Sequence, residues 1–266
     1  MYLGVDYYPE HWNENMLNED LDNIIELGSN VIRIGEFAWH MMERIEGEYD
    51  FSYFDHVIAK AKEKGLKVIF GTPTATMPAW LAKNYPDVLS EFEDNTKRAF
   101  GGRRQYCFNS RTYHKFSEKI IRALAEHYKN EKGIVAWQID NEFGHEGSDI
   151  CFCDECKRAF RDYLKEAYNN NINRLNEIWG TVFWSQEYND FDEIPLPAKT
   201  ITTHNPSLRM EWERFRSLSV ERYAKMQVDL LKEVLGEDSV VMHDFSGGYF
   251  DKSYDFSKVA QHLDVV

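Results

Sequence analysis

A short polar cluster, Asp140-Asn141-Glu142, directly follows an apolar run from Ile134 to Ile139. The apolar run predicts a buried strand, and the carboxyl end of such a strand holds side chains rigidly beside loops and solvent. A carboxyl group there can donate and accept a proton, and the amide beside it can bind a hydroxyl group. Glycoside cleavage needs such an acid and a second carboxylate across the sugar ring. The alternative is a solvated Asp-Asn-Glu turn after a strand, since an Asn-Glu pair by itself is a weak signal.

The four cysteines form a second candidate site. Cys151, Cys153 and Cys156 follow the polar cluster in a C-x-C-x-x-C pattern, and the fourth is Cys107. Thiolates at this density suit a tetrahedral Zn²⁺ site closed by four sulfurs, which is a structural rather than a catalytic arrangement. The alternative is free thiols or disulfides, although a Cys-x-Cys bridge is geometrically awkward and a reducing compartment disfavours disulfides.

The composition excludes several kinds of partner. The 266 residues carry a net charge of −14, which repels nucleic acid and anionic membrane surfaces. No apolar run approaches the roughly 20 residues of a membrane helix, and residues 1–12 lack the pattern of a signal peptide. We therefore expect a cytoplasmic protein that binds neither nucleic acid nor membrane. The length suits one α/β barrel or two small domains.

Strand and helix patterns alternate along the chain without hairpin signals. Strands are predicted at 2–7, 30–35, 67–72, 134–139, 239–244 and 263–266, and helices at 16–27, 51–64, 112–128, 154–168, 172–179, 208–235 and 256–261, with a long loop before about residue 109. Such alternation predicts a parallel α/β sheet, closed as a barrel or open and doubly wound.

The residues at the strand ends favour the barrel. No G-x-G-x-x-G motif follows the first strand, so a dinucleotide site is unsupported. Polar residues instead end nearly every strand, namely Asp6, Arg33, Thr72, Asn141-Glu142 and His243-Asp244. This distribution fits the mouth of a (β/α)8 TIM barrel, of which the chain supplies about six strands.

Five longer segments resemble glycoside hydrolase family 42, the β-galactosidases. They are residues 7–12, 31–39, 71–81, 103–110 and 137–142, which read YYPEHW, VIRIGEFAW, GTPTATMPAWL, RRQYCFNS and WQIDNE. The resemblance covers essentially the whole chain. It implies a (β/α)8 barrel and retaining hydrolysis of terminal β-D-galactosides without an organic cofactor. It also implies Glu142 as the acid/base and Asn141 as its sugar-binding neighbour.

The resemblance implies further site residues. Arg33 matches the family's substrate-contacting arginine, with a salt bridge at the barrel rim as the alternative. Trp184 falls where the family brings a tryptophan towards the sugar, or it packs as a loop aromatic on the barrel. Glu36 either orients Arg33 or forms an ordinary ion pair. Some family members bind zinc through four cysteines at this place, which would pin the loop after the third strand to the loop after the fourth, and the family suggests a homotrimer.

The histidines carry no metal-binding pattern. We interpret His11, His145 and His243 as hydrogen-bonded structural residues, since no H-E-x-x-H or similar motif joins them. Asp244 differs from the asparagine that the resemblance implies at its position, which puts the polar rim of the fifth strand in doubt.

The family's nucleophile, a glutamate at the end of the seventh strand, matches no residue of this chain. We therefore expect residues 1–266 to form an incomplete barrel domain of a longer enzyme, without activity alone. Turnover of an aryl β-galactoside by the pure chain, lost in Glu142→Gln, would contradict this. The alternative function is a non-catalytic, zinc-stabilised carbohydrate-binding barrel. A cellulase-like or mannanase-like barrel would share the Asn-Glu pair but would not explain the cysteines.

Overall fold

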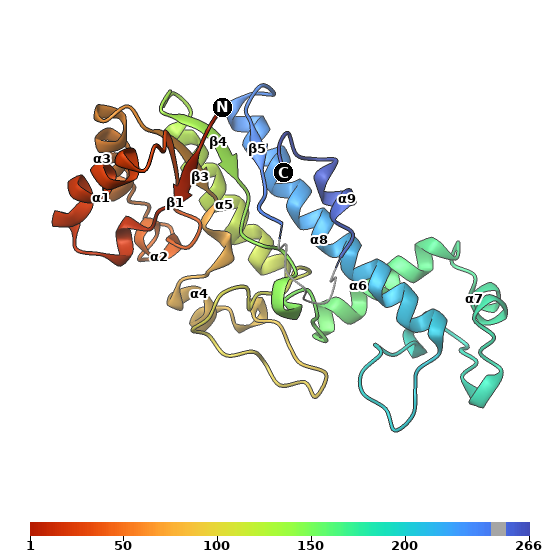
Figure 1. The fold of residues 1–266 in the computed structure, drawn as a ribbon. Helices are drawn as coiled ribbons and strands as arrows, with labels where there is room; N and C mark the ends of the chain where they lie inside the picture. The colour runs from red at the N-terminus through yellow and green to blue at the C-terminus, as the bar shows by residue number, and fades with distance from the viewer. Residues whose placement is uncertain (246–253) are drawn as a thin grey trace.

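Parallel strands form one sheet in the computed structural model, which describes residues 1–245 and 254–266 (Figure 1). The strands in this part of the chain are β1 (Gly4–Asp6), β2 (Val31–Ile34), β3 (Lys67–Gly71), β4 (Ile134–Gln138) and β5 (Val241–Met242). Each pairs in parallel with its neighbour in sequence, in the order β1-β2-β3-β4-β5. A doubly wound sheet reverses this order at a switch point, whereas a barrel keeps it. The fold is therefore part of a (β/α)8 barrel, as predicted.

Helices connect the strands and cover one face of the sheet (Figure 1). They are α1 (Leu17–Glu26), α2 (Trp39–Met42), α3 (Ser52–Glu63), α4 (Ala79–Asn84), α5 (Arg111–Tyr128), α6 (Asp154–Ala167), α7 (Ile172–Trp179), α8 (Pro206–Leu235) and α9 (Phe256–Ala260). Helix α5 shows why they pack there: Phe116, Ile120 and Leu124 recur every four residues and are buried, which gives the helix one apolar stripe. Helices α6 and α7 extend away from the sheet, beside the N-terminal half of α8 (Figure 1).

Two clusters of buried apolar residues hold the described parts together. The larger lies between the sheet and its helices and includes the stacked rings of Phe70 and Trp137, whose centroids are 5.7 Å apart. The smaller lies under α6, α7 and the start of α8, and it contains all four cysteines packed with Phe160 and Trp212. The cysteines therefore lie inside the core of the α6–α7 extension.

The strands differ from the prediction mainly at the C-terminal side. The first four strands are confirmed with ends shifted by at most two residues. The fifth was predicted over six residues, but only Val241 and Met242 pair as a strand. The sixth, predicted at 263–266, is a single parallel bridge between Val265 and Met242. Val265 is 48% exposed, so it is only half-buried at this bridge.

The long loop before residue 109 is more structured than predicted. It contains α4 and two short antiparallel bridges, Leu89 with Tyr106 and Glu91 with Lys97. These contacts fold the loop back on itself and set the position of the residues that follow Gly102. Among the described residues, no helix combines the length and the apolar character needed to cross a bilayer.

Candidate active site

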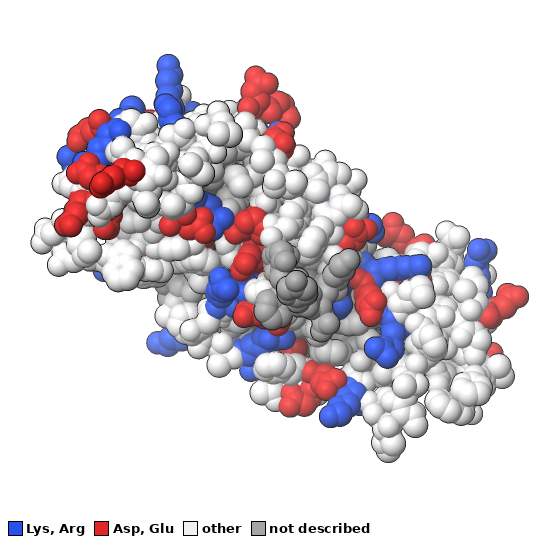
Figure 2. Space-filling view, in the orientation of Figure 1, with Lys and Arg blue, Asp and Glu red and all other residues white. Residues whose placement is uncertain are grey.

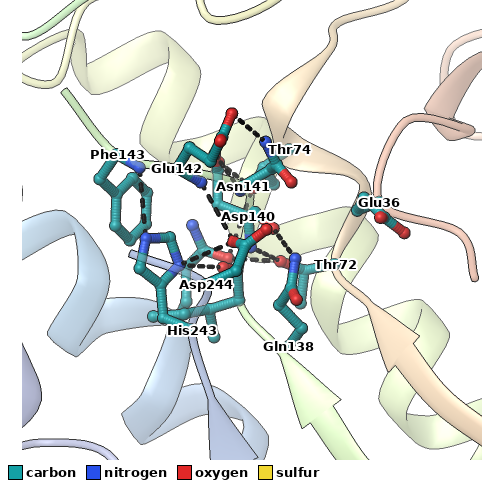
Figure 3. Close-up of polar contacts among 12 residues, drawn as sticks. Glu36, Thr72, Thr74, Gln138, Asp140, Asn141, Glu142, Phe143, His243 and Asp244 are labelled. Carbon is teal, nitrogen blue, oxygen red and sulfur yellow. Dashed lines mark hydrogen bonds and ion pairs between the residues drawn. The ribbon is translucent and has the colours of Figure 1, made fainter. Parts of the chain in front are cut away.

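The backbone turns sharply where β4 ends. Asp140 has a φ of 49° and Glu142 a φ of 44°, a left-handed conformation that residues with a Cβ adopt rarely. Hydrogen bonds hold it: the Asp140 amide donates to Thr72 Oγ1 at 2.7 Å, and Gln138 Nε2 donates to the Asp140 carbonyl at 2.9 Å. Asp140, where the turn begins, is therefore fixed on both sides of its backbone to residues at the ends of β3 and β4 (Figure 3).

Asp140 is the buried centre of this turn. Its carboxylate accepts hydrogen bonds from the Tyr106 hydroxyl at 3.0 Å, from the Thr74 hydroxyl and from the Asn141 amide at 2.8 Å. Burial raises the pKa of Asp140 to about 6, although these hydrogen bonds and Arg104 act in the opposite direction. Asp140 therefore stabilises the turn through buried hydrogen bonds and has no exposed surface for a substrate.

Glu142 is turned towards the loop that follows β3. Its Oε2 accepts hydrogen bonds from Arg104 Nη1 at 2.7 Å and Asn141 Nδ2 at 3.2 Å, and Arg103 Nη1 lies 3.5 Å away. Partial burial favours the neutral acid, but the hydrogen bond and charge of Arg104 outweigh it, so the pKa of Glu142 lies below its ordinary value. The side chain is 28% exposed and can reach a ligand.

Arg33 lies within ion-pair distance of three carboxylates on the same side of the sheet. Its guanidinium is 2.8 Å from Asp6, 3.1 Å from Glu36 and 3.0 Å from Asp244. It also donates to Gln138 Oε1 at 2.7 Å. Glu36 is fully buried and forms an ion pair with Arg33 Nε, a contact that both sequence interpretations of Glu36 expect.

Asp244 and His243 connect β5 to the β4 turn. Asp244 Oδ1 accepts from the Glu142 amide at 3.1 Å while Oδ2 accepts from Arg33. His243 is buried: Nδ1 donates to the Ile139 carbonyl at 2.8 Å and Nε2 accepts from the Phe143 amide at 3.2 Å. Burial lowers its pKa to about 4, so the ring stays neutral and serves as a structural hydrogen-bonding residue, which agrees with the sequence interpretation (Figure 3).

Trp184 is not near these residues. It belongs to the 3-10 turn Phe183–Ser185, which follows α7 at the end of the extension away from β4 (Figure 1). Its ring is 60% exposed and stacks on Phe183 with the centroids 4.6 Å apart. The structure therefore does not bring Trp184 together with Glu142 within this chain, and its role in substrate binding stays a prediction.

The four cysteines do come together. One sulfur atom from each of Cys107, Cys151, Cys153 and Cys156 lies within 4.8 Å of all the others, and all four side chains are buried. The Cys107 sulfur is 3.6 Å from that of Cys153 and 3.4 Å from that of Cys156. Sulfurs around a tetrahedral Zn²⁺ at ~2.3 Å would lie about 3.8 Å apart. The donor set and its spacing therefore fit the metal.

Sequence reasoning missed the residues that contact Glu142 from other segments. Arg103 and Arg104 stood out only as part of a longer motif, and Asp244 was placed at the barrel mouth without a contact to Glu142. The available signal for the arginines was weak: two adjacent cations lie in the loop between β3 and α5, but far along it from the end of β3. Their pairing with Glu142 depends on the left-handed turn, which no local pattern predicts.

Sequential parallel strands with a carboxyl-amide pair at the mouth define the class of the protein, a TIM barrel with a glycosidase-like site. The chain belongs to the β-galactosidase family, glycoside hydrolase family 42, whose sequence profile matches residues 6–266. It is 41% identical over 262 residues to β-galactosidase BgaA of a Thermus species, which covers 98% of this chain and 40% of the relative. β-Galactosidase BgaH of Haloferax lucentense is 38% identical, covering 99% and 39%.

Solved structures agree with this membership. The β-galactosidase of Halorubrum lacusprofundi superposes with a TM-score of 0.95 at 39% identity, over 100% of this chain and 39% of that one. The Marinomonas ef1 β-galactosidase gives 0.94 at 39% identity, over 100% and 40%. A β-amylase catalytic domain from Paenibacillus polymyxa shares the fold at 14% identity and a TM-score of 0.74. The chain thus spans about 40% of the length of the β-galactosidases named here.

Proposed function

We propose that Glu142 is the general acid/base of a retaining glycoside hydrolase that cleaves terminal β-D-galactosides. The observation that carries this is the Glu142 carboxyl, which the β4 turn fixes at the barrel mouth and leaves partly exposed, with Asn141 bonded to the same oxygen. Membership in a family described as β-galactosidase supports the substrate class. Asn141 and Arg33 are proposed to bind the sugar.

The reaction needs two carboxyl groups. Glu142 would be one of them, and no residue of this chain is assigned as the other. Glu142 would protonate the departing glycosidic oxygen and later take a proton from water, while a second carboxylate about 5–5.5 Å away attacks the anomeric carbon. Asn141 Nδ2 would donate to the sugar 2-hydroxyl, a contact that strengthens at the transition state. Proton donation requires Glu142 to be protonated, so a bound substrate or a nearby anion must offset the charge of Arg104.

Calorimetry with cationic sugar mimics tests this assignment. We expect the chain to bind a galactose-configured iminosugar about tenfold more tightly than its glucose-configured epimer. Glu142→Gln, which keeps the shape but removes the charge, should lose about tenfold in affinity, because the cation loses its carboxylate partner. Glu146→Gln is the matched control, since it removes the other carboxylate bound to Arg104. Equal binding of both epimers, or undiminished binding by Glu142→Gln, would refute the proposal.

We further propose that Cys107, Cys151, Cys153 and Cys156 bind one structural Zn²⁺. The mutual sulfur distances and the complete burial of the four thiols support this. When bound, the metal would supply a rigid cross-link and no catalytic chemistry, because four protein sulfurs fill its tetrahedral shell. Elemental analysis should find one zinc per chain, and Co²⁺ substitution should give strong thiolate charge-transfer absorption. Purified folded protein without metal in any preparation would contradict the proposal.

We also propose a cellular location and an assembly state. Four buried thiols without a disulfide suit a reducing compartment, which supports a cytoplasmic location. A homo-oligomer, a trimer in the family, is proposed on the resemblance alone. Light scattering of the purified protein measures its mass, and a mass equal to one chain would contradict an oligomer of this chain.

A further inference from the structure

Each of the four buried cysteine sulfurs accepts a hydrogen bond from one N–H group of the described chain. Three of these donors are backbone amides and one is a side-chain amide. The pairs are Glu91 N with Cys151 at 3.3 Å, Asn109 N with Cys107 at 3.3 Å, Cys156 N with Cys153 at 3.5 Å, and Asn109 Nδ2 with Cys156 at 3.3 Å. Hydrogen bonds are stronger when the acceptor is ionised, so this arrangement suits thiolates better than neutral thiols.

The metal-loaded site would be a buried anion. Four thiolates outnumber the two charges of a Zn²⁺ ion, and buried charge is costly unless it is paired or hydrogen-bonded. In the part of the chain that the structure describes, no lysine or arginine donates to these sulfurs. Figure 2 shows basic and acidic side chains intermixed over the extension on the face it draws, without a concentrated positive patch. The N–H groups are therefore what the described chain supplies to offset this charge.

Asn109 contacts two of the four sulfurs. Its backbone N–H reaches Cys107, in the loop after β3, and its side-chain Nδ2 reaches Cys156, in the first turn of α6. These two sulfurs are 3.4 Å apart. Among the described residues Nδ2 of Asn109 is the one side-chain N–H that donates to a cysteine sulfur, whereas the backbone donors are present whatever the side chain. Asn109 is thus the donor that a substitution can remove.

The same side chain borders the solvent. Asn109 is part of the lining of a surface pocket of about 370 Å³ between the start of α5 and α8, and none of the four cysteines lines this pocket. Asn109 therefore touches the pocket on one side and the Cys156 sulfur on the other. Shortening its side chain would open a path from the pocket towards that sulfur.

We propose that Asn109 is a positioning residue of the metal centre, which holds the Cys107 and Cys156 thiolates together and offsets their charge through its two N–H groups. This rests on the proposed zinc binding and adds a residue, outside the four ligands, on which retention of the metal depends. Partners that orient metal ligands from outside the coordination shell typically contribute about 10- to 100-fold in metal affinity.

Cadmium binding to the purified chain tests the role of Asn109. Competition with a chelator measures the Cd²⁺ affinity, and ¹¹³Cd NMR reports the electron density on the sulfurs. Asn109→Ala removes Nδ2 and keeps the backbone N–H, and it should lower the affinity by about tenfold. Asn109→Asp keeps the shape but turns a carboxylate oxygen towards a thiolate, so it should lower the affinity further. Both variants should shift the ¹¹³Cd resonance.

Asn205→Ala is the matched control for a merely structural effect. Asn205 Nδ2 donates to the Trp179 carbonyl at 2.9 Å, and its Oδ1 caps α8 by accepting from the Ser207 amide at 2.8 Å. The control therefore removes an asparagine amide from the same extension without touching a sulfur. It should lower the melting temperature but leave the Cd²⁺ affinity and the ¹¹³Cd resonance unchanged.

The outcomes separate this role from the metal site itself. Wild type that binds Cd²⁺, with unchanged affinity and resonance in both Asn109 variants, would overturn the role of Asn109 and leave the metal site standing. Equal effects of Asn205→Ala and Asn109→Ala on the resonance would also overturn it, because the change would then come from the fold of the extension. A folded wild-type chain that binds neither Cd²⁺ nor Zn²⁺ would refute the metal site and this role with it.

Discussion

Arg104 Nη1 donates a hydrogen bond of 2.7 Å to Glu142 Oε2, and the Arg104 side chain is only 1% exposed. The cation is therefore nearly withdrawn from water while its partner carboxyl keeps some solvent contact. This relationship sets the protonation of Glu142 in the described structure more than any other single contact does.

Removing Arg104 should raise the pKa of Glu142. In Arg104→Gln the hydrogen bond weakens and the charge disappears, so only the smaller effects of Arg103 and His145 still oppose the burial of the carboxyl. A ¹³C NMR titration of the glutamate side chains measures this. Glu146→Gln serves as the control and should not raise the pKa, because Arg104 keeps its bond to Glu142. An unchanged Glu142 pKa in Arg104→Gln would show that Arg104 does not control the acid.

Asp149→Asn should stabilise the protein at alkaline pH. Burial raises the pKa of Asp149 to about 6, against the charges of Arg216 and Arg98, while an unfolded aspartate has a pKa of ~3.9. The folded state therefore binds the extra proton between these values, and the stabilising contribution is present below about pH 4 and lost as pH rises through about 6. We expect a gain of about 1–3 kcal/mol at pH 8 and little gain at pH 4.

Urea unfolding of the Asp149→Asn variant and wild type at both pH values gives this difference, in which other pH effects cancel. Asp94→Asn is a control of opposite sign. Asp94 is exposed, and its hydrogen bonds with Thr96 hold its pKa below the ordinary value. The contribution of Asp94 to the free energy of unfolding is therefore present above about pH 4 and is lost as the pH falls. A destabilised Asp149→Asn at pH 8 would contradict the expected sign.

Arg33→Met should destabilise the fold strongly. Glu36 is fully buried and loses its cation, and removing one partner of a buried ion pair costs about 3–5 kcal/mol. Arg122→Ala is the matched control, because its pair with Glu233 is 48% and 63% exposed and should cost less than about 1 kcal/mol. Chemical denaturation at pH 7 measures both. Similar losses in the two variants would mean that the Arg33 network is no more than a surface ion-pair cluster.

Removal of zinc should lower the melting temperature. A chelator, or Cys107→Ser, would separate segments that the thiols hold together, and we expect a fall of more than about 5 °C. Re-addition of Zn²⁺ after chelation should restore the wild type but not the variant. Calorimetric scans follow both. A melting temperature that is indifferent to chelator in metal-loaded protein would rule out a structural role.

The sequence predicted the fold well because the strands from residue 2 to residue 139 are apolar runs separated by helices with a clear apolar stripe. These patterns are local in the sequence, and the folded structure keeps the strands and helices that they predict. The fifth and sixth strands were predicted too long: only Val241 and Met242 pair in the fifth, and the sixth is a single bridge at Val265, which is 48% exposed. Apolar composition alone does not state whether a neighbour will cover the residue.

The candidate site was predicted in part. The position of Glu142, Asn141 and Arg33 at the barrel mouth could be predicted, because the ends of strands can be located from sequence. The contacts of Arg104 and Asp244 with Glu142 were not predicted, because they join residues 38 and 102 positions apart, which no motif encodes. Trp184 was placed by alignment of a loop, and a loop at the end of an extension carries little information about its distance from β4.

The left-handed backbone at Asp140 and Glu142 has a consequence for laboratory evolution. Each such residue costs of order 1–3 kcal/mol compared with a relaxed conformation, and glycine or asparagine would relieve that cost. A selection for thermal endurance alone would therefore enrich those replacements at Glu142, whose side chain is partly exposed, and erode the proposed acid in the process, whereas the buried hydrogen bonds of Asp140 oppose the same change there. Libraries of this barrel should hold both positions constant or be screened for sugar binding in parallel.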